Sequence, residues 1–97
     1  MTARDQIIET LRQHDEVLRT RFKVKSIGLF GSFVRGEQSK RSDIDLLVEF
    51  AETVSMFEFI RLEDYLAKAL GHQVDLVMKS ALKPRLGERI LAEVAYP

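Results

Sequence analysis

Two aspartates in the segment 42–45, which reads Ser-Asp-Ile-Asp, have the types and spacing that point most directly to chemistry. Asp43 and Asp45 flank Ile44 at the start of an apolar run that is typical of a buried β-strand. Because alternate residues of a strand face the same way, both carboxylates would point to one side while Ile44 enters the core. Two neighbouring carboxylates repel each other, and such oxygen ligands suit Mg²⁺ bound together with substrate phosphates. Taken alone, an Asp-x-Asp pair is also compatible with loop and surface positions.

A third aspartate, Asp75, interrupts another apolar segment between Val74 and Leu76. An ionised carboxylate among apolar residues is costly to desolvate, so we expect all three aspartates to be buried acids retained for function. Three carboxylates around two metal ions are the apparatus of in-line phosphoryl or nucleotidyl transfer. In that arrangement, Asp43 and Asp45 hold the metals that bind a triphosphate. Asp75 completes the second metal site and helps to deprotonate the attacking hydroxyl.

A glycine–serine pair, Gly31 and Ser32, directly follows the first strand-like segment. Glycine lets the backbone approach an anion, and the start of a short helical turn favours negative charge, so the pair could bind phosphates. Arg35, three residues after the serine, is placed to neutralise phosphate charge. Alone, a Gly-Ser pair is also an ordinary turn. Lys40 and Arg41 in the following loop are compatible either with phosphate binding or with a solvated loop.

The hydrophobic pattern predicts the elements that must position these residues. We expect strands over 24–30, 44–50 and 73–78, and helices over 3–20, from a cap at Ser55 to Gly71, and from Pro84 onward. About a dozen residues separate the first two strands, which is short for a helical crossover and favours antiparallel pairing. More than twenty residues containing a helix separate the last two strands, which favours a right-handed parallel crossover.

This topology brings the end of the first strand and the starts of the other two strands to one edge of the sheet. All the candidate site residues would meet at that edge. The expected fold class is therefore α/β, or α+β, with a small mixed β-sheet of about three strands and flanking helices.

The composition is that of a single small globular domain over residues 1–97, with 45% hydrophobic and 31% charged residues. The absence of cysteine excludes disulfides, thiolate metal sites and cysteine nucleophiles. No apolar run approaches the ~18 residues of a membrane span and no signal peptide opens the sequence, so we expect a cytoplasmic protein without membrane contact. Fifteen basic and fifteen acidic residues cancel, which argues against direct nucleic-acid binding.

The combined motif of residues 31–45 resembles that of a known superfamily. Gly31 and Ser32 are followed after ten residues by Asp43-x-Asp45, with Arg35 between them and a third aspartate in a later strand. This pattern resembles the nucleotidyltransferase superfamily that includes DNA polymerase β. The chain as a whole is similar to the minimal nucleotidyltransferases (MNT proteins), the antitoxin halves of HEPN/MNT toxin–antitoxin pairs.

The resemblance implies the nucleotidyltransferase fold and AMPylation, with Mg²⁺ as cofactor and ATP as donor of AMP. The implied acceptor is a hydroxyl, with tyrosine favoured, of a cognate HEPN ribonuclease toxin. By matching position, Gly31 and Ser32 would bind the triphosphate, and Asp43, Asp45 and Asp75 would be the metal-binding and catalytic acids. Larger superfamily members append a helical substrate-binding domain, so a separate helical toxin is expected to supply that part in a hetero-oligomer, and a homo-oligomer stays open.

Two alternatives to this enzyme remain open from the sequence. The chain could neutralise a toxin by occlusion with nucleotide as a structural ligand, or could transfer a nucleotide to a small molecule or an RNA 3′ end. For contact with a helical partner, we expect an exposed apolar surface on the last helix and tail, formed by Leu86, Ile90, Val94 and Tyr96. Packing on the sheet is the competing expectation, and it is the favoured one for Ile90 and Leu91.

Overall fold

Three strands form one sheet in which the spatial order follows the chain, and the computed structural model describes all residues 1–97. The strands are β1 (Val24–Phe30), β2 (Ile44–Phe50) and β3 (Val74–Met78). The helices are α1 (Ala3–Gln13), α2 (Asp15–Arg21), α3 (Ser32–Arg35), α4 (Met56–Leu70) and α5 (Pro84–Glu93), with a 3-10 turn, η1 (Lys79–Ala81), before the last. No helix combines the length and the hydropathy that crossing a membrane requires.

The strand directions confirm the topology predicted from the loop lengths. β1 pairs with β2 antiparallel, and β2 pairs with β3 parallel through the crossover helix α4. Phe30, at the end of β1, lies opposite Asp45, and Asp45 lies opposite Asp75. The expected fold class, an α/β domain built on a small mixed sheet with flanking helices, is confirmed.

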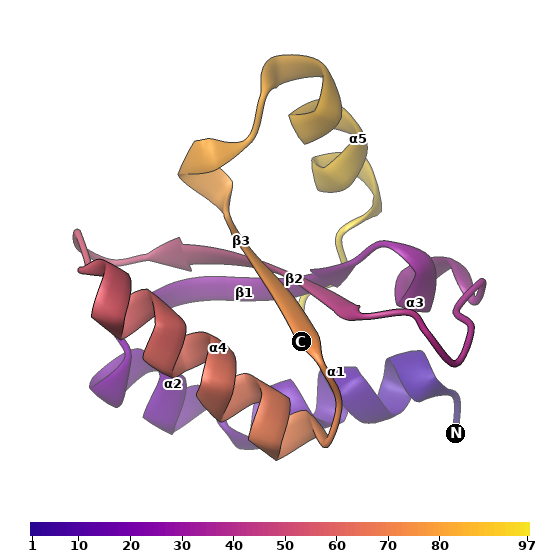
Figure 1. The fold of residues 1–97 in the computed structure, drawn as a ribbon, viewed down its shortest axis with the longest axis horizontal. Helices are drawn as coiled ribbons and strands as arrows, with labels where there is room; N and C mark the ends of the chain where they lie inside the picture. The colour runs from indigo at the N-terminus through magenta and orange to yellow at the C-terminus, as the bar shows by residue number, and fades with distance from the viewer.

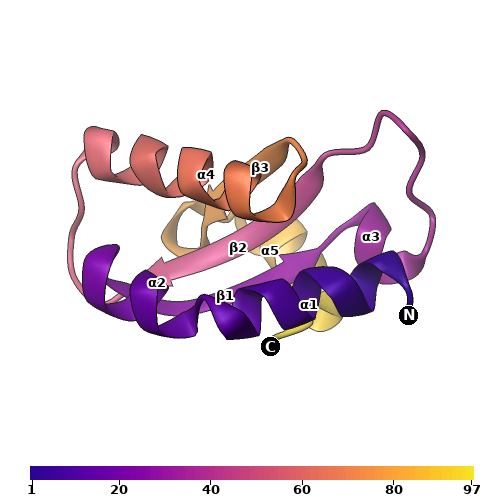
Figure 2. The same ribbon diagram turned by 90° about the horizontal axis from the view of Figure 1, so that it is seen from below.

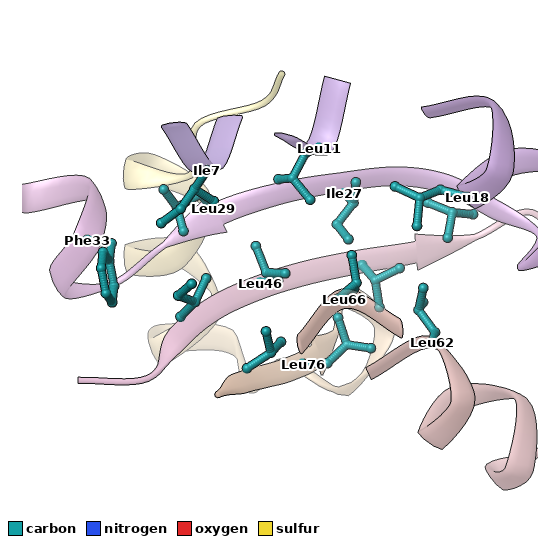
Figure 3. Packing of buried hydrophobic residues seen from close by; sticks show 14 residues of the cluster. Ile7, Leu11, Leu18, Ile27, Leu29, Phe33, Leu46, Leu62, Leu66 and Leu76 are labelled. Carbon is teal, nitrogen blue, oxygen red and sulfur yellow. The ribbon is translucent and has the colours of Figure 1, made fainter. Parts of the chain in front are cut away.

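One face of the sheet carries most of the hydrophobic core. Helices α1, α2 and α4 lie across this face, as the two ribbon views show (Figures 1 and 2). Side chains from these helices interdigitate with alternate strand residues in a cluster of 14 buried residues (Figure 3). Leu62 and Leu66 of α4 and Leu46 of β2 are almost completely inaccessible to solvent, and each such leucine stabilises the fold by roughly 2 kcal/mol.

The N-terminal helix predicted over 3–20 is in fact two helices. His14 takes φ −96° and ψ 7°, so α1 ends before it and α2 begins after it. Its imidazole forms a hydrogen bond to the Tyr65 hydroxyl of α4, and the two rings meet edge to face. The break therefore comes with a tertiary contact, and Leu11 before it and Leu18 after it both remain buried.

The second face of the sheet is covered only in part, by α5 and the C-terminal tail. Phe30, Leu47 and Ile90 form a buried cluster of three on this side. Leu29 and Ala95 exchange two backbone hydrogen bonds of 2.8 Å, which tie the tail to the outer edge of β1. In Figure 1, α5 stands above the sheet, away from the three helices of the opposite face. A cleft of about 880 Å³ lies between β3, η1 and α5.

Gly31 makes the sharp turn from β1 into α3. Its φ of 79° and ψ of −154° fall in a region that is open essentially to glycine alone. A Cβ atom at this position would also collide with the carboxylate of Asp45 on the neighbouring strand. Gly36, which ends α3 with φ 71°, has open space around it instead. Gly31 is thus required by packing as well as by backbone conformation.

We predict that Gly31→Ala costs much more stability than Gly36→Ala. In Gly36→Ala, the alanine must adopt a left-handed backbone conformation, which costs about 1 kcal/mol. In Gly31→Ala, backbone strain and a clash with Asp45 together cost about 3 kcal/mol or more. Urea denaturation of both variants and the wild type measures the difference. Equal losses in the two variants would contradict the packing of Gly31 against Asp45.

Candidate active site

Asp45 and Asp75 lie on the partly covered face of the sheet, and Asp43 lies in the loop directly before β2. Ile44 and Leu46 enter the main core, so Asp45 between them faces the other way. Val74 and Leu76 also enter the main core, and Asp75 between them faces the same side as Asp45. Because Asp45 and Asp75 are register partners on parallel strands, their carboxylates project side by side from one end of the sheet.

The expectation that all three acids are buried is wrong. Asp43 and Asp45 are half-buried and Asp75 is exposed, and the protein has no fully buried charged residue. The physical reason is that Asp45 and Asp75 lie on the face that α5 covers only in part, and Asp43 lies in the loop before β2. Their carboxylates are therefore accessible to a substrate, and the apolar neighbours along the sequence belong to the opposite face.

Asp45 is the carboxyl group most affected by these surroundings. Partial burial raises the pKa of Asp45 to about 6, and repulsion from Asp75 and Asp43 adds to the shift. The charge of Arg35 opposes the shift, while Glu93 adds a small further increase to the pKa. The site thus holds an excess of negative charge that a bound cation would relieve.

The donor set fits Mg²⁺ bound together with a phosphate-bearing substrate. No group of three or more His, Asp or Glu side chains is arranged to hold a metal ion by itself. Mg²⁺, however, usually takes one or two carboxylates and completes its shell with water and phosphate oxygens. The accessible carboxylates of Asp43, Asp45 and Asp75 would offer oxygen ligands of that kind to an ion bound together with a substrate.

The residues predicted to bind phosphate lie next to the aspartates. Gly31 packs against Asp45, and half-buried Ser32 opens α3 directly after it. Arg35 ends α3, where its Nε donates to Glu37 at 2.6 Å and its Nη1 pairs with Glu93 at 2.9 Å. Hydrogen bonds to both glutamates raise the pKa of Arg35.

Lys40 and Arg41 are exposed in the loop between α3 and β2, at positions compatible with a solvated loop.

Glu93 is a site residue that the sequence analysis missed. It is the last residue of α5, and its Oε1 accepts a hydrogen bond of 2.8 Å from the backbone N–H of Gly31. No local pattern marks Glu93, because its partners lie 58 and 62 residues earlier in the chain. Only the docking of α5 on the sheet brings it to the turn.

The apolar surface expected on the last helix and tail is partly confirmed. Leu86 and Tyr96 are exposed, by 56% and 47%, but Ile90 is buried against the sheet and Val94 packs beside it. The expectation that Leu91 packs on the sheet is wrong, since it is 45% exposed. Ile90 and Leu91 differ because one residue step turns a helix by about 100°, so Ile90 faces the sheet and Leu91 faces outward.

We predict that Asp45→Asn stabilises the protein at neutral pH. The raised pKa of Asp45 means that folding favours its protonated form, so its stabilising contribution is full below about pH 3.8 and is lost as the pH rises through 6. The free energy of unfolding of the variant should exceed that of the wild type by about 1 kcal/mol above pH 6, after allowance for solvent screening at this half-exposed site, and the two should converge toward pH 4.

Thermal or urea unfolding between pH 4 and pH 8 measures this difference. Asp64→Asn, on the exposed side of α4, serves as the matched control and should show no comparable gain at neutral pH. A loss of stability in Asp45→Asn at pH 7 would mean that the carboxylate supports the fold.

Known proteins share both the sequence and the architecture of this chain. Residues 11–96 match the family described as nucleotidyltransferase domain. The protein adenylyltransferase MntA of Thermococcus cleftensis is 49% identical over 96 residues, which cover 99% of this chain and 97% of the relative.

Solved structures of toxin–antitoxin complexes show the same architecture. A chain of a toxin–antitoxin structure with AMP-PNP superposes with a TM-score of 0.68 at 31% identity, covering 96% of this chain and 70% of the other. A chain from the complex of tri-AMPylated Shewanella oneidensis HEPN toxin with MNT antitoxin gives a TM-score of 0.60 at 28% identity, covering 97% and 67%. With the carboxylate edge and the glycine–serine turn in place, this chain belongs to the nucleotidyltransferase domain family and is an enzyme of its minimal, protein-adenylylating branch.

Proposed function

We propose that this chain is the antitoxin of a toxin–antitoxin pair and transfers AMP from ATP, with Mg²⁺, to a tyrosine hydroxyl of a HEPN toxin. The observation that carries the proposal is the side-by-side projection of Asp45 and Asp75 beside the Gly31 turn, on an accessible face of the sheet. The relatives named above as a protein adenylyltransferase, and as partners of an AMPylated HEPN toxin, support the choice of donor and acceptor.

Each residue has a defined task in this reaction. Asp43 and Asp45 hold Mg²⁺, which neutralises phosphate charge when it is bound. The turn at Gly31 and Ser32 binds the triphosphate, and Arg35, whose pairing with the glutamates uses Nε and Nη1, has Nη2 left for a phosphate oxygen.

Asp75, exposed at the start of β3, accepts the proton of the acceptor hydroxyl. The hydroxyl oxygen then forms a bond to the α-phosphorus of ATP. The bond from that phosphorus to the bridging oxygen breaks, and pyrophosphate leaves with its electron pair.

Neutralisation by occlusion is the second candidate, and one observation favours it. Exposed apolar surface is present at three side chains on α5 and the tail, Leu86, Leu91 and Tyr96, which a partner protein could cover. Such a surface would bind a toxin whether or not transfer follows, so the two candidates differ only in the need for the carboxylates.

Nucleotide binding should depend on Mg²⁺. Calorimetric titration with ATP should give an affinity at least about tenfold higher in Mg²⁺ than in EDTA, because the crowded carboxylates repel the triphosphate without a cation. The double variant Asp43→Asn/Asp45→Asn should lose most of this gain. Equal affinities in the two buffers would contradict the metal site.

Transfer should be visible in the mass of the partner. After co-expression with its cognate HEPN toxin, the toxin should gain about 329 Da for each AMP added, as read by intact-mass spectrometry. Asp43→Asn/Asp45→Asn should abolish the gain, whereas Asp64→Asn, far from the site on α4, should leave it unchanged. If the double variant protects cells fully from the toxin, and the toxin does not gain mass even with the wild-type chain, occlusion is the mechanism.

A further inference from the structure

The carboxylate of Glu93 joins three parts of the molecule at the edge of the active site. It accepts the N–H of Gly31 at 2.8 Å, and both its oxygens pair with Nη1 of Arg35, at 3.0 and 2.9 Å. The Glu93 side chain is only 26% exposed, and hydrogen bonds to a charged acceptor are about twice as strong as neutral ones. One side chain of α5 thus holds both the turn after β1 and the end of α3.

The turn needs such a partner. Gly31 has a sparsely populated backbone conformation, which persists only where its surroundings fix it. Helix α3 has only four residues, too few to order the turn by itself. Arg35 is 48% exposed and would lose substantial side-chain entropy on binding a phosphate unless it were already held.

We propose that Glu93 is a positioning residue for nucleotide transfer, holding the Gly31–Ser32 turn and the Arg35 guanidinium ready for the triphosphate. The inference rests on the proposed function in one respect, namely that this turn and Arg35 bind ATP. It also makes α5, which forms one wall of the 880 Å³ cleft beside Asp75, part of the same rigid unit.

The opposite role would be competition, in which the Glu93 carboxylate fills the place of a phosphate and must leave before ATP binds. The hydrogen bonds favour positioning. Glu93 takes the N–H of Gly31, which precedes α3, and leaves the helix-opening amides of Ser32 and Phe33 without a carboxylate partner. It pairs with Nη1 of Arg35 and leaves Nη2 for a ligand.

The test combines calorimetry with nuclear magnetic resonance on the full chain, with Mg²⁺ and ATP as the probe. Glu93→Ala should weaken ATP binding about tenfold, the usual scale for losing a partner that orients a binding group. Glu93→Gln should weaken it less, because its amide oxygen can still accept the Gly31 N–H. The matched control Glu88→Gln, an exposed position on the same helix, should leave the affinity unchanged.

Two further measurements separate positioning from general support of the fold. In an Arg35→Ala background, Glu93→Ala should have a smaller effect on ATP affinity, since one of the two groups that it positions is already absent and only its hold on the Gly31 turn remains. In the wild type, the Gly31 amide should keep the chemical shift of an N–H that is hydrogen-bonded to a carboxylate when ATP is added.

Three outcomes would overturn the positioning role alone. If Glu93→Ala binds ATP as tightly as the wild type, Glu93 has no role in ATP binding. If the variant binds ATP more tightly, Glu93 competes with the nucleotide. Loss of the Gly31–Glu93 hydrogen bond on ATP addition would also indicate competition. If Glu93→Ala fails to fold, Glu93→Gln provides the test instead. The proposal is overturned if Glu93→Gln binds ATP as tightly as the wild type although its Gly31 amide resonance no longer shows the hydrogen bond to residue 93. A wild-type chain that does not bind ATP at all would instead overturn the proposed function, and the positioning role with it.

Discussion

The contact between Gly31 and the carboxylate of Asp45 is the constraint on which the arrangement of the site depends. The last residue of β1, Phe30, lies opposite Asp45 in the sheet, so the chain must turn away directly beside that carboxylate. Only a residue without a side chain fits there, in a conformation that only glycine adopts readily. The turn, and with it Ser32 and α3, therefore lies as close to the acidic edge as the backbone permits.

The two faces of the sheet divide stability from chemistry. Helices α1, α2 and α4 bury one face almost completely, and the 14 residues of the main cluster supply most of the hydrophobic stabilisation. The other face keeps only a cluster of three buried residues under α5, which leaves room for accessible carboxylates. Accessible carboxylates that repel each other destabilise the fold. The site tolerates them because hydrophobic packing on the opposite face offsets this destabilisation.

Negative charge exceeds positive charge around the site, although the whole chain is neutral. Asp43, Asp45 and Asp75 concentrate negative charge at one end of the sheet, and burial together with this repulsion raises the pKa of Asp45 to about 6. Arg35 opposes that shift, but its guanidinium is shared with Glu37 and Glu93. The remaining excess of negative charge is what suits the site to a divalent cation and a phosphate-bearing ligand in combination.

The sequence by itself determined the strands, the directions in which they pair and the edge at which the candidate residues meet. These features depend on local patterns: the alternation around Ile44, the capping box of Ser55 and Glu58, and the loop lengths between strands. Tertiary structure decided the break at His14, the exposure of Asp75 and the placement of Glu93 on Gly31. Each of these depends on which segments pack against each other across dozens of residues, as with the Tyr65 hydroxyl beside His14 and the partial cover of α5. Periodicity shows which side of an element is apolar, but what covers that side is decided only when the whole chain packs.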